Sequence, residues 1–320
     1  MHNFPVRTLF LSLVLVGGMQ LSLGQEESRS NEGLLVLYDF SLVEGALVRD
    51  ISGRKPPLDL RIANIKAVRR ARGTLEIRGN TTILTAGAAS RVIEAVKRSG
   101  AISVEAWVQP ANIKQDGPAR IVTISSNISN RNFTLGQDGN KLDVRLRTSR
   151  TSNNGLPSTS SPGGSLKAQL IHVVYTRDAG GQARIYLDGR QVSQKKVDGD
   201  LGKWDGGYRL GIANEASGQR PWLGTYHLVA LYGRVLESGE ILRNFNAGAG
   251  VHTAELVAAR KKEAASLLFE TRVAPILANH CLECHEPANR KGKLDLSTRA
   301  AAFAGGSEGK AIMPGKPGDS

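Results

Sequence analysis

The chain has 320 residues, with 42 Lys and Arg against 29 Asp and Glu, a net charge of +13 and only two cysteines. This length allows one large and one small domain, and two cysteines exclude a disulfide scaffold for the larger one. Aromatic residues make up only 5% of the chain, and the 36 glycines favour short strands joined by many turns over a helical bundle.

Residues 1–24 have the pattern of a secretory signal peptide. Arg7 precedes an apolar run at 9–16, and Ser22 and Gly24 are the small residues expected before a cleavage site. A membrane anchor is the alternative, but the run is well short of the roughly 20 apolar residues of a spanning helix. We expect cleavage after Gly24, no transmembrane segment, and a secreted or periplasmic protein that can associate with the cell surface.

After a polar leader at 25–32 with nothing to bury, residues 33–249 show the pattern of successive strands. Residues 101–108 and 141–147 alternate apolar and polar side chains, as a strand with one buried face does. Further β-prone runs lie at 33–40, 170–176, 182–187, 208–212 and 224–232. Without alternating helices, these runs predict a mainly β fold, an antiparallel β-sandwich of the jelly-roll kind.

Two connections within this region have their own signals. Asp188-Gly189 follows one run and is a hairpin-turn dipeptide. Residues 151–165 are rich in Ser, Thr, Asn, Gly and Pro, so we expect a flexible loop between two strands.

The composition changes near residue 250. Residues 253–273 are rich in Ala, Glu, Lys, Leu and Arg with helical spacing, and Pro275 disfavours continuation of that helix. We assign 250–266 to a helical linker and 267–320 to a small C-terminal module. Residues 286–320 contain few apolar side chains, so the module looks incomplete.

The motif Cys281-x-x-Cys284-His285 predicts a covalently attached c-type haem. Its two thiols add to the two vinyl groups of the porphyrin, and the adjacent histidine becomes the proximal iron ligand. The export signal and the absence of other cysteines favour this interpretation. The sequence thus predicts haem c as the cofactor, with His285 as the iron ligand.

Two other interpretations of the motif stay open. A Cys281–Cys284 redox disulfide would resemble a thioredoxin-type site, but no βαβ pattern surrounds it. A structural zinc site could use both cysteines with His280 and His285, although ligands adjacent in sequence do not easily close one tetrahedron. We favour haem over the disulfide, and the disulfide over zinc.

Met313 is the candidate distal iron ligand, because it is the only methionine after the motif. It stands beside a proline and within a glycine-rich segment. Binding to the iron would have to order this segment, at a cost in conformational entropy of about 1–2 kcal/mol per residue. We therefore predict that the sixth iron position is open, or filled by water or another histidine.

The C-terminal module resembles the planctomycete-type cytochrome c domain. The resemblance rests on five segments, which are 269–277, 281–285, 291–299, 305–309 and 313–317. Glu286 replaces the glycine that usually follows the haem histidine, and Met313 occupies a position that is usually aliphatic. The family's distal-ligand segment would come after residue 320, so the resemblance implies a partial domain.

Residues 33–249 resemble the laminin-G-like and concanavalin A-like lectin sandwich. The segments that carry this resemblance are 172–177, 185–189, 210–214, 222–224 and 230–236. Members bind glycans or proteins, often beside a calcium ion. The usual aspartate of the last core strand is absent from Tyr226-His227-Leu228, and the other calcium candidates, Asp39, Asp50 and Asp188, equally suit turns.

Catalysis by the sandwich is not expected. Retaining glycosidases need two carboxylates about 5–5.5 Å apart, whereas Glu105 stands alone on its strand. Four aromatic residues could instead stack on sugar rings or belong to the core. They are Tyr175, Tyr186, Trp204 and Trp222.

Residues 25–250 hold ten more basic than acidic residues, which either attracts polyanions or only aids solubility. In an exported protein we expect acidic polysaccharide, a cell-surface glycan or a redox partner protein, and no nucleic acid. The sequence therefore predicts a haem c protein that transfers electrons and docks through a lectin-like domain. The alternatives are a polysaccharide- or protein-binding accessory module with a redox-silent cytochrome segment, and an enzyme subunit with a catalytic domain beyond Ser320.

Overall fold

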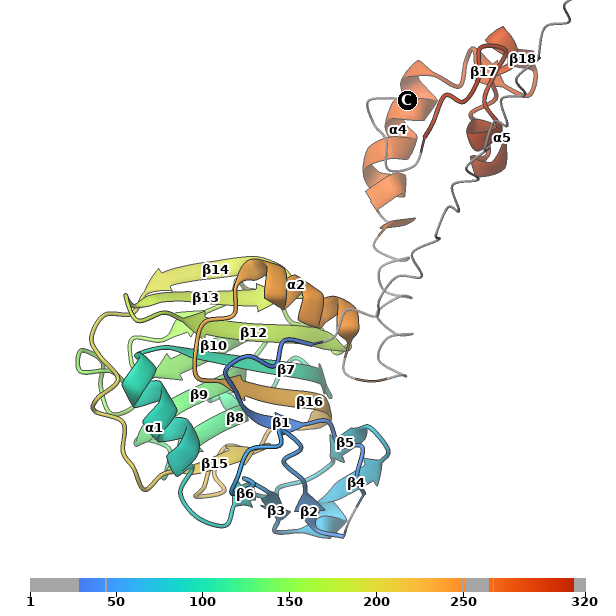
Figure 1. Cartoon of the computed structure of the whole chain (residues 1–320). Helices are drawn as coiled ribbons and strands as arrows, with labels where there is room; N and C mark the ends of the chain where they lie inside the picture. The colour runs from blue at the N-terminus through green and yellow to red at the C-terminus, as the bar shows by residue number, and fades with distance from the viewer. Residues whose placement is uncertain (1–28, 44, 249, 251–264, 267, 314–320) are drawn as a thin grey trace, which may run out of the picture.

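A computed structural model describes residues 29–43, 45–248, 250, 265–266 and 268–313. The predicted signal peptide and most of the predicted helical linker lie outside these residues. Residues 29–248 form two antiparallel sheets packed face to face (Figure 1), so the predicted β-sandwich is confirmed. Among the described helices, none has the length and apolar character needed to cross a membrane.

The first sheet has the strand order β14-β13-β12-β7-β16-β5-β4, and β1 also pairs with β16. Its strands are β1 (Leu34–Tyr38), β4 (Val68–Ala71), β5 (Thr74–Ile77), β7 (Ile102–Pro110), β12 (Ile171–Arg177), β13 (Gln182–Leu187), β14 (Arg190–Lys196) and β16 (Gly224–Tyr232). β7 is central and lies between β12 and β16. Asp188 and Gly189 both have positive φ between β13 and β14, which confirms the predicted hairpin turn.

The second sheet has the order β11-β10-β9-β8-β15-β6-β3-β2. Its strands are β2 (Leu47–Val48), β3 (Leu60–Ile62), β6 (Ile83–Thr85), β8 (Ala119–Ser125), β9 (Arg131–Asp138), β10 (Lys141–Leu146), β11 (Thr159–Ser160) and β15 (Arg209–Ile212). Each sheet also contains neighbours that are far apart along the chain, such as β7 beside β16 and β8 beside β15, so the sandwich depends on long-range pairing.

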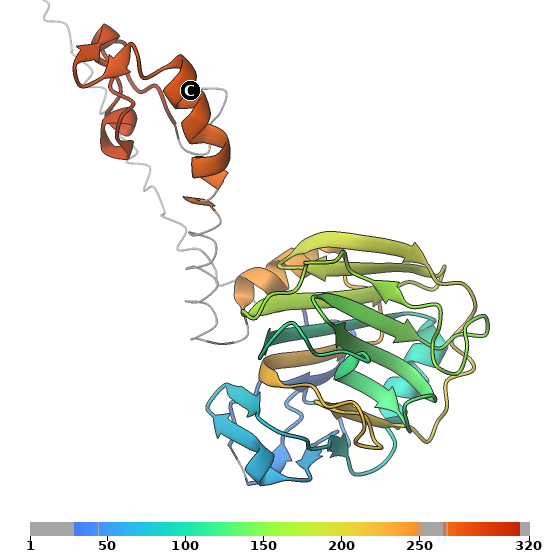
Figure 2. The ribbon, with the colours of Figure 1, turned by 180° about the vertical axis from the view of Figure 1, so that it is seen from behind.

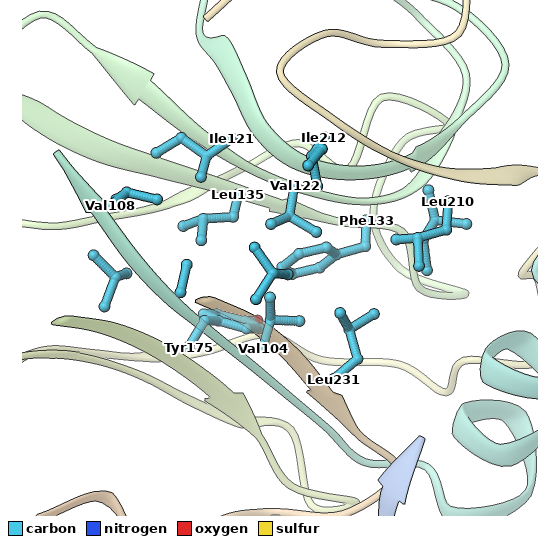
Figure 3. Close-up of a cluster of buried hydrophobic side chains, with 14 of the residues drawn as sticks. Val104, Val108, Ile121, Val122, Phe133, Leu135, Tyr175, Leu210, Ile212 and Leu231 are labelled. Atoms are coloured by element: carbon cyan, nitrogen blue, oxygen red, sulfur yellow. The ribbon is translucent and has the colours of Figure 1, made fainter. Parts of the chain in front are cut away.

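Apolar side chains of the two inner faces meet in one core (Figure 3). Val104 and Val108 of β7 point into it, as the alternation predicted, and they meet Phe133 and Leu135 of β9. All four are completely buried. Burial of a side chain of this size contributes about 1.5–3 kcal/mol, so this layer holds the two sheets together.

The sequence analysis missed two helices. α1 (Ser90–Ser99) buries Val92, Ile93 and Val96, and ends at Gly100 in the left-handed conformation. α2 (Ser238–Ala247) begins with a capping box and buries Ile241 and Phe245 in a second apolar cluster, which also includes Trp107 of β7. Figure 1 shows α2 in front of this sheet, and Figure 2 shows the sandwich from the opposite side. α2 therefore covers the face of the first sheet that points away from the main core.

The predicted flexible loop at 151–165 is instead tied to the second sheet. Its residues 159–160 form β11, which pairs with β10. The Ser161 N–H donates to the Leu142 carbonyl at 3.1 Å, and the Arg131 N–H donates to the Asn153 carbonyl at 3.1 Å. These backbone bonds satisfy polar groups that an irregular segment would otherwise leave open.

The C-terminal part is mainly helical. It contains a π-helical turn (Phe269–Val273), α4 (Ala274–His280), β17 (His285–Glu286), β18 (Asn289–Arg290), a 3₁₀ turn (Lys291–Lys293) and α5 (Arg299–Ala304). Contrary to our expectation, the helix continues past Pro275. That proline is the second residue of α4, where a missing N–H is tolerated, and the π-helical turn before it accommodates the ring.

Candidate functional site

The Cys-x-x-Cys-His motif begins where α4 ends. The Cys281 N–H still donates to the Leu277 carbonyl at 2.9 Å, and the His285 N–H donates to the Cys281 carbonyl at 3.1 Å. The motif is therefore a tight turn closed on the end of the helix. Both cysteines are free thiols and partly exposed residues, so neither sulfur is committed to a disulfide.

The side chain of His285 has no hydrogen bond within the described residues, and its Nδ1 atom is buried without a partner. Its backbone is held on two sides, because β17 pairs with β18 and the Leu296 N–H donates to the His285 carbonyl at 2.8 Å. Lys291 Nζ lies 3.3 Å from Cys284 Sγ. A metal ligand needs a defined orientation and a free nitrogen atom. His285 has both, because its backbone is fixed and its imidazole forms no hydrogen bond.

Apolar side chains are unusually exposed around the motif. Leu268 is 60% exposed and Ile276 is 58% exposed, and the other exposed apolar residues of the C-terminal part are Phe269, Val273 and Ile312. Four of the five lie on the helical segment that leads into Cys281. A porphyrin has two large apolar faces, so this surface and the two free thiols fit a covalently held haem.

Met313, the candidate distal ligand, is partly exposed and lies outside any helix. The nearby Gly306–Gly309 bridge orders only the turn before it. For the zinc alternative, His280, Cys281, Cys284 and His285 are not gathered into a group that could hold a metal ion in the part of the chain described.

The four aromatic residues proposed as sugar platforms belong to the core. Tyr175 and Trp222 have no exposed surface, Trp204 is 2% exposed and Tyr186 is 6% exposed. The indole N–H of Trp222 donates to Gln137 Oε1 at 2.8 Å, and that of Trp204 donates to the Arg147 carbonyl at 2.9 Å. A buried ring cannot stack on a sugar, so this prediction is wrong and the core interpretation holds.

The three aspartates considered for calcium all accept hydrogen bonds from backbone N–H groups. Asp39 accepts from the Ser41 N–H at 3.0 Å, and Asp188 accepts from the His172 N–H at 3.0 Å. Asp50 accepts from three backbone N–H groups and pairs with Arg91 at 2.6 Å. Their oxygens fix turns and loops.

Glu105, expected to stand alone on its strand, is the centre of a buried polar cluster. It accepts from His172 Nε2 at 2.8 Å, from the Tyr232 hydroxyl at 3.2 Å and from Asn244 Nδ2 at 2.9 Å, and it forms an ion pair with Arg29. Burial tends to raise the pKa of Glu105, but Arg29 and His172 outweigh it and hold that pKa well below its usual range. The carboxylate is therefore charged and fully engaged.

The same cluster corrects the expectation that residues 25–32 bury nothing. Arg29 is 12% exposed at its side chain, and it also donates to the Gly248 carbonyl. The Ser30 N–H donates to Asn244 Oδ1 at 2.9 Å. Sequence reasoning missed the cluster because its members come from distant segments. The one sequence signal was a glutamate among the apolar residues of a predicted strand.

Comparison with known families agrees with this architecture. Residues 80–242 match the family model of the concanavalin A-like lectin/glucanases superfamily, and residues 281–320 match that of planctomycete cytochrome C. The first match covers half of the chain, so the chain belongs to the concanavalin A-like lectin/glucanases superfamily. The second identifies a cytochrome c domain at the predicted place, and it begins at Cys281.

Solved structures show the same sandwich. A sialidase of Trypanosoma rangeli in complex with sialic acid is 17% identical, with a TM-score of 0.50, over 67% of this chain and 33% of the sialidase. The binding domain of botulinum neurotoxin DC in complex with rat synaptotagmin II is 14% identical, with a TM-score of 0.50, over 68% of this chain and 52% of that chain. The chain thus spans a third to a half of these proteins, and the likeness concerns the fold. None of the curated proteins matches the chain.

Proposed function

We propose that this protein is an exported haem c protein that transfers electrons and docks to its surroundings through the lectin-like sandwich. The observation that carries the proposal is the end of α4, where two free, partly exposed cysteines and an imidazole without a hydrogen bond follow a helix with exposed apolar side chains. Export to the periplasm or beyond is part of the proposal, because the N-terminal segment has the pattern of a signal peptide.

Each residue of the motif would have a separate role. Cys281 and Cys284 would each add sulfur and a proton across one vinyl double bond, which forms two thioethers and needs no external oxidant. His285 would hold the iron through its free Nε2, while the β17–β18 pair and Leu296 fix its backbone. Haem iron, once bound, supplies reversible one-electron chemistry. The apolar surface that includes Leu268 and Ile276 would then be covered.

The sandwich supports docking rather than catalysis. Its fold is that of a lectin-like superfamily, and Glu105 is committed to a buried structural cluster. The excess of basic residues in 25–250 favours acidic glycans or an acidic redox partner.

Expression with a c-type maturation system tests the haem assignment. The wild-type protein should retain haem through denaturing electrophoresis, and Cys281→Ser/Cys284→Ser should lose it. His280→Gln is the matched control, because only the zinc alternative uses that side chain, and it should retain haem. Stoichiometric zinc without covalent haem in the wild type would contradict the proposal.

Electron transfer needs a second measurement, since the accessory-module alternative also allows a bound haem. The loaded protein should be reduced and reoxidised reversibly in spectroelectrochemistry, and a soluble redox protein should exchange electrons with it. A haem that is attached but cannot be cycled would favour the redox-silent alternative.

A further inference from the structure

A cavity of about 660 Å³ opens beside α1 in the sandwich. The start of β1, the loop at 54–58 and one side of α1, from Ser90 to Arg98, surround it. The apolar part of its lining consists of Leu34, Leu35, Pro56, Leu58, Ala88 and Ala95. The charged part consists of Arg54, Lys55, Arg91 and Arg98, with Glu94 as the carboxylate of the lining. The cavity therefore combines an apolar wall with an excess of positive charge.

Most of this positive charge is uncompensated. Within the described residues, Lys55 and Arg98 are exposed, and their side chains form neither a hydrogen bond nor an ion pair. Arg54 uses its Nε to donate to the Leu34 carbonyl at 3.0 Å, which leaves its two terminal nitrogens available. Like charges placed together repel one another, so an anion that enters the cavity relieves this repulsion.

Asp50 fixes the positions of Arg91 and of the loop at 54–58. Asp50 Oδ2 pairs with Arg91 Nη2 at 2.6 Å and accepts from the Leu58 N–H at 3.0 Å. Burial tends to raise the pKa of Asp50, but the hydrogen bonds from Leu58, Ser52 and Leu37 lower it. A charged Asp50 therefore fixes the wall of the cavity before any ligand arrives.

The start of α1 adds to the attraction for an anion. Its N-cap residue, Ala89, has no side chain that could accept from the first backbone N–H groups, and Ser90 lines the cavity. Uncapped N–H groups at a helix N-terminus carry partial positive charge. The partial positive charge at the start of α1 therefore adds to the positive charge of the lining, to which Ser90 belongs.

We propose that this cavity binds an acidic sugar unit, carboxylated or sulfated, of a polysaccharide. The volume lies within the roughly 300–1,000 Å³ of small-molecule sites. Leu35, Leu58 and Ala95 offer apolar contacts for the C–H groups of a sugar ring, and the cations face its acidic substituent. The inference deepens the docking role proposed above and does not depend on the haem.

Calorimetry on the full haem-loaded chain at low salt tests the inference with four probes. These are a sulfated oligosaccharide, an oligogalacturonate, a neutral cello-oligosaccharide of the same length, and inorganic phosphate. We expect binding of at least one acidic oligosaccharide, little binding of the neutral one, and loss of binding as salt rises. Equal binding of the neutral sugar, equal binding of phosphate, or no binding at all would overturn the inference.

Charge-matched variants separate the cavity from the general positive charge of the chain. Lys55→Gln/Arg98→Gln should weaken binding about tenfold, whereas Glu94→Gln should strengthen it. Lys114→Gln/Lys167→Gln removes the same charge from exposed positions outside the cavity lining and should leave affinity unchanged. Equal weakening by both double variants would overturn the site.

Haem staining of the same samples separates the two proposals. Haem retained without acidic-sugar binding tells against this cavity alone. Acidic-sugar binding without covalent haem tells against the electron-transfer function alone.

Discussion

Arg29, which precedes the first strand, forms a buried ion pair with Glu105 in the middle of β7. The Glu105 carboxylate has no exposed surface, and it also accepts from His172 and Asn244. A buried charge that loses its partner retains the whole cost of desolvation. This cluster is therefore the place where a single polar substitution should affect the stability of the sandwich most.

Glu105→Gln should lower the free energy of unfolding by about 3–5 kcal/mol, because Arg29 then lacks a carboxylate. Urea denaturation followed by tryptophan fluorescence measures the change. Glu76→Gln is the matched control, since Glu76 pairs with Arg69 and Arg78 on the surface. Its cost should be about 0.2–1 kcal/mol. Similar losses in the two variants would contradict the central role of Glu105.

His227 should make the stability of the sandwich depend on pH. Burial lowers the pKa of His227 to about 4, whereas the unfolded chain has the ordinary value of about 6.5. Between these values the unfolded state binds a proton that the folded state does not. Stability should therefore fall as the pH is lowered from about 6.5 to about 4.

The variant His227→Gln should show a flatter stability profile in that window, measured as the urea midpoint at successive pH values. Below this pH window, the variant and the wild type should both lose further stability. Hydrogen bonds from Arg234, Glu237 and Ser30 hold the pKa of Glu240 at about 2 despite its partial burial, and protonation of this depressed carboxylate removes those bonds. An identical slope in variant and wild type above pH ~4 would assign the effect to other groups.

Trp222→Phe should destabilise the sandwich without affecting any glycan affinity. The substitution keeps an aromatic ring in the core but removes the donor to Gln137, at a cost of about 1–3 kcal/mol. Thermal unfolding and the sugar titrations described above are measured on the same protein. Loss of sugar affinity with unchanged stability would restore Trp222 as a binding residue.

Met313→Leu should leave the oxidised spectrum of the loaded protein unchanged, because we predict that the sixth iron position is not filled by this thioether. A methionine–iron charge-transfer band in the wild type that disappears in the variant would show the opposite. Either outcome leaves the roles of Cys281 and Cys284 untouched.

The sequence predicted the local features of the fold well. Alternation identified the inner face of β7, including Val104 and Val108, and the spacing of Cys281, Cys284 and His285 located the candidate haem site. Helix α1 was missed because Ala89 gives no N-cap signal, although Gly100 at its end is a common stop signal. The short apolar segment around Val92 was therefore not recognised as helical.

Features that depend on long-range pairing could not be predicted. β7 lies between β12 and β16, and nothing local in the sequence sets that order. The same limit applies to the cavity beside α1 and to Glu105, whose partners come from β12, β16, α2 and the segment before β1. Lys55 and Arg98 are 43 positions apart in the sequence, and only the packing of the loop against α1 brings them together.

The bond from Arg29 to the Gly248 carbonyl means that the two ends of the sandwich meet. A short connection between them would close the domain into a ring, and new termini could be opened at the exposed Ala179-Gly180 turn between β12 and β13. Circular permutation succeeds best at such solvent-facing turns. The sandwich is therefore suited to insertion, as a cassette, into a surface loop of another protein, where its two ends would disturb the host little.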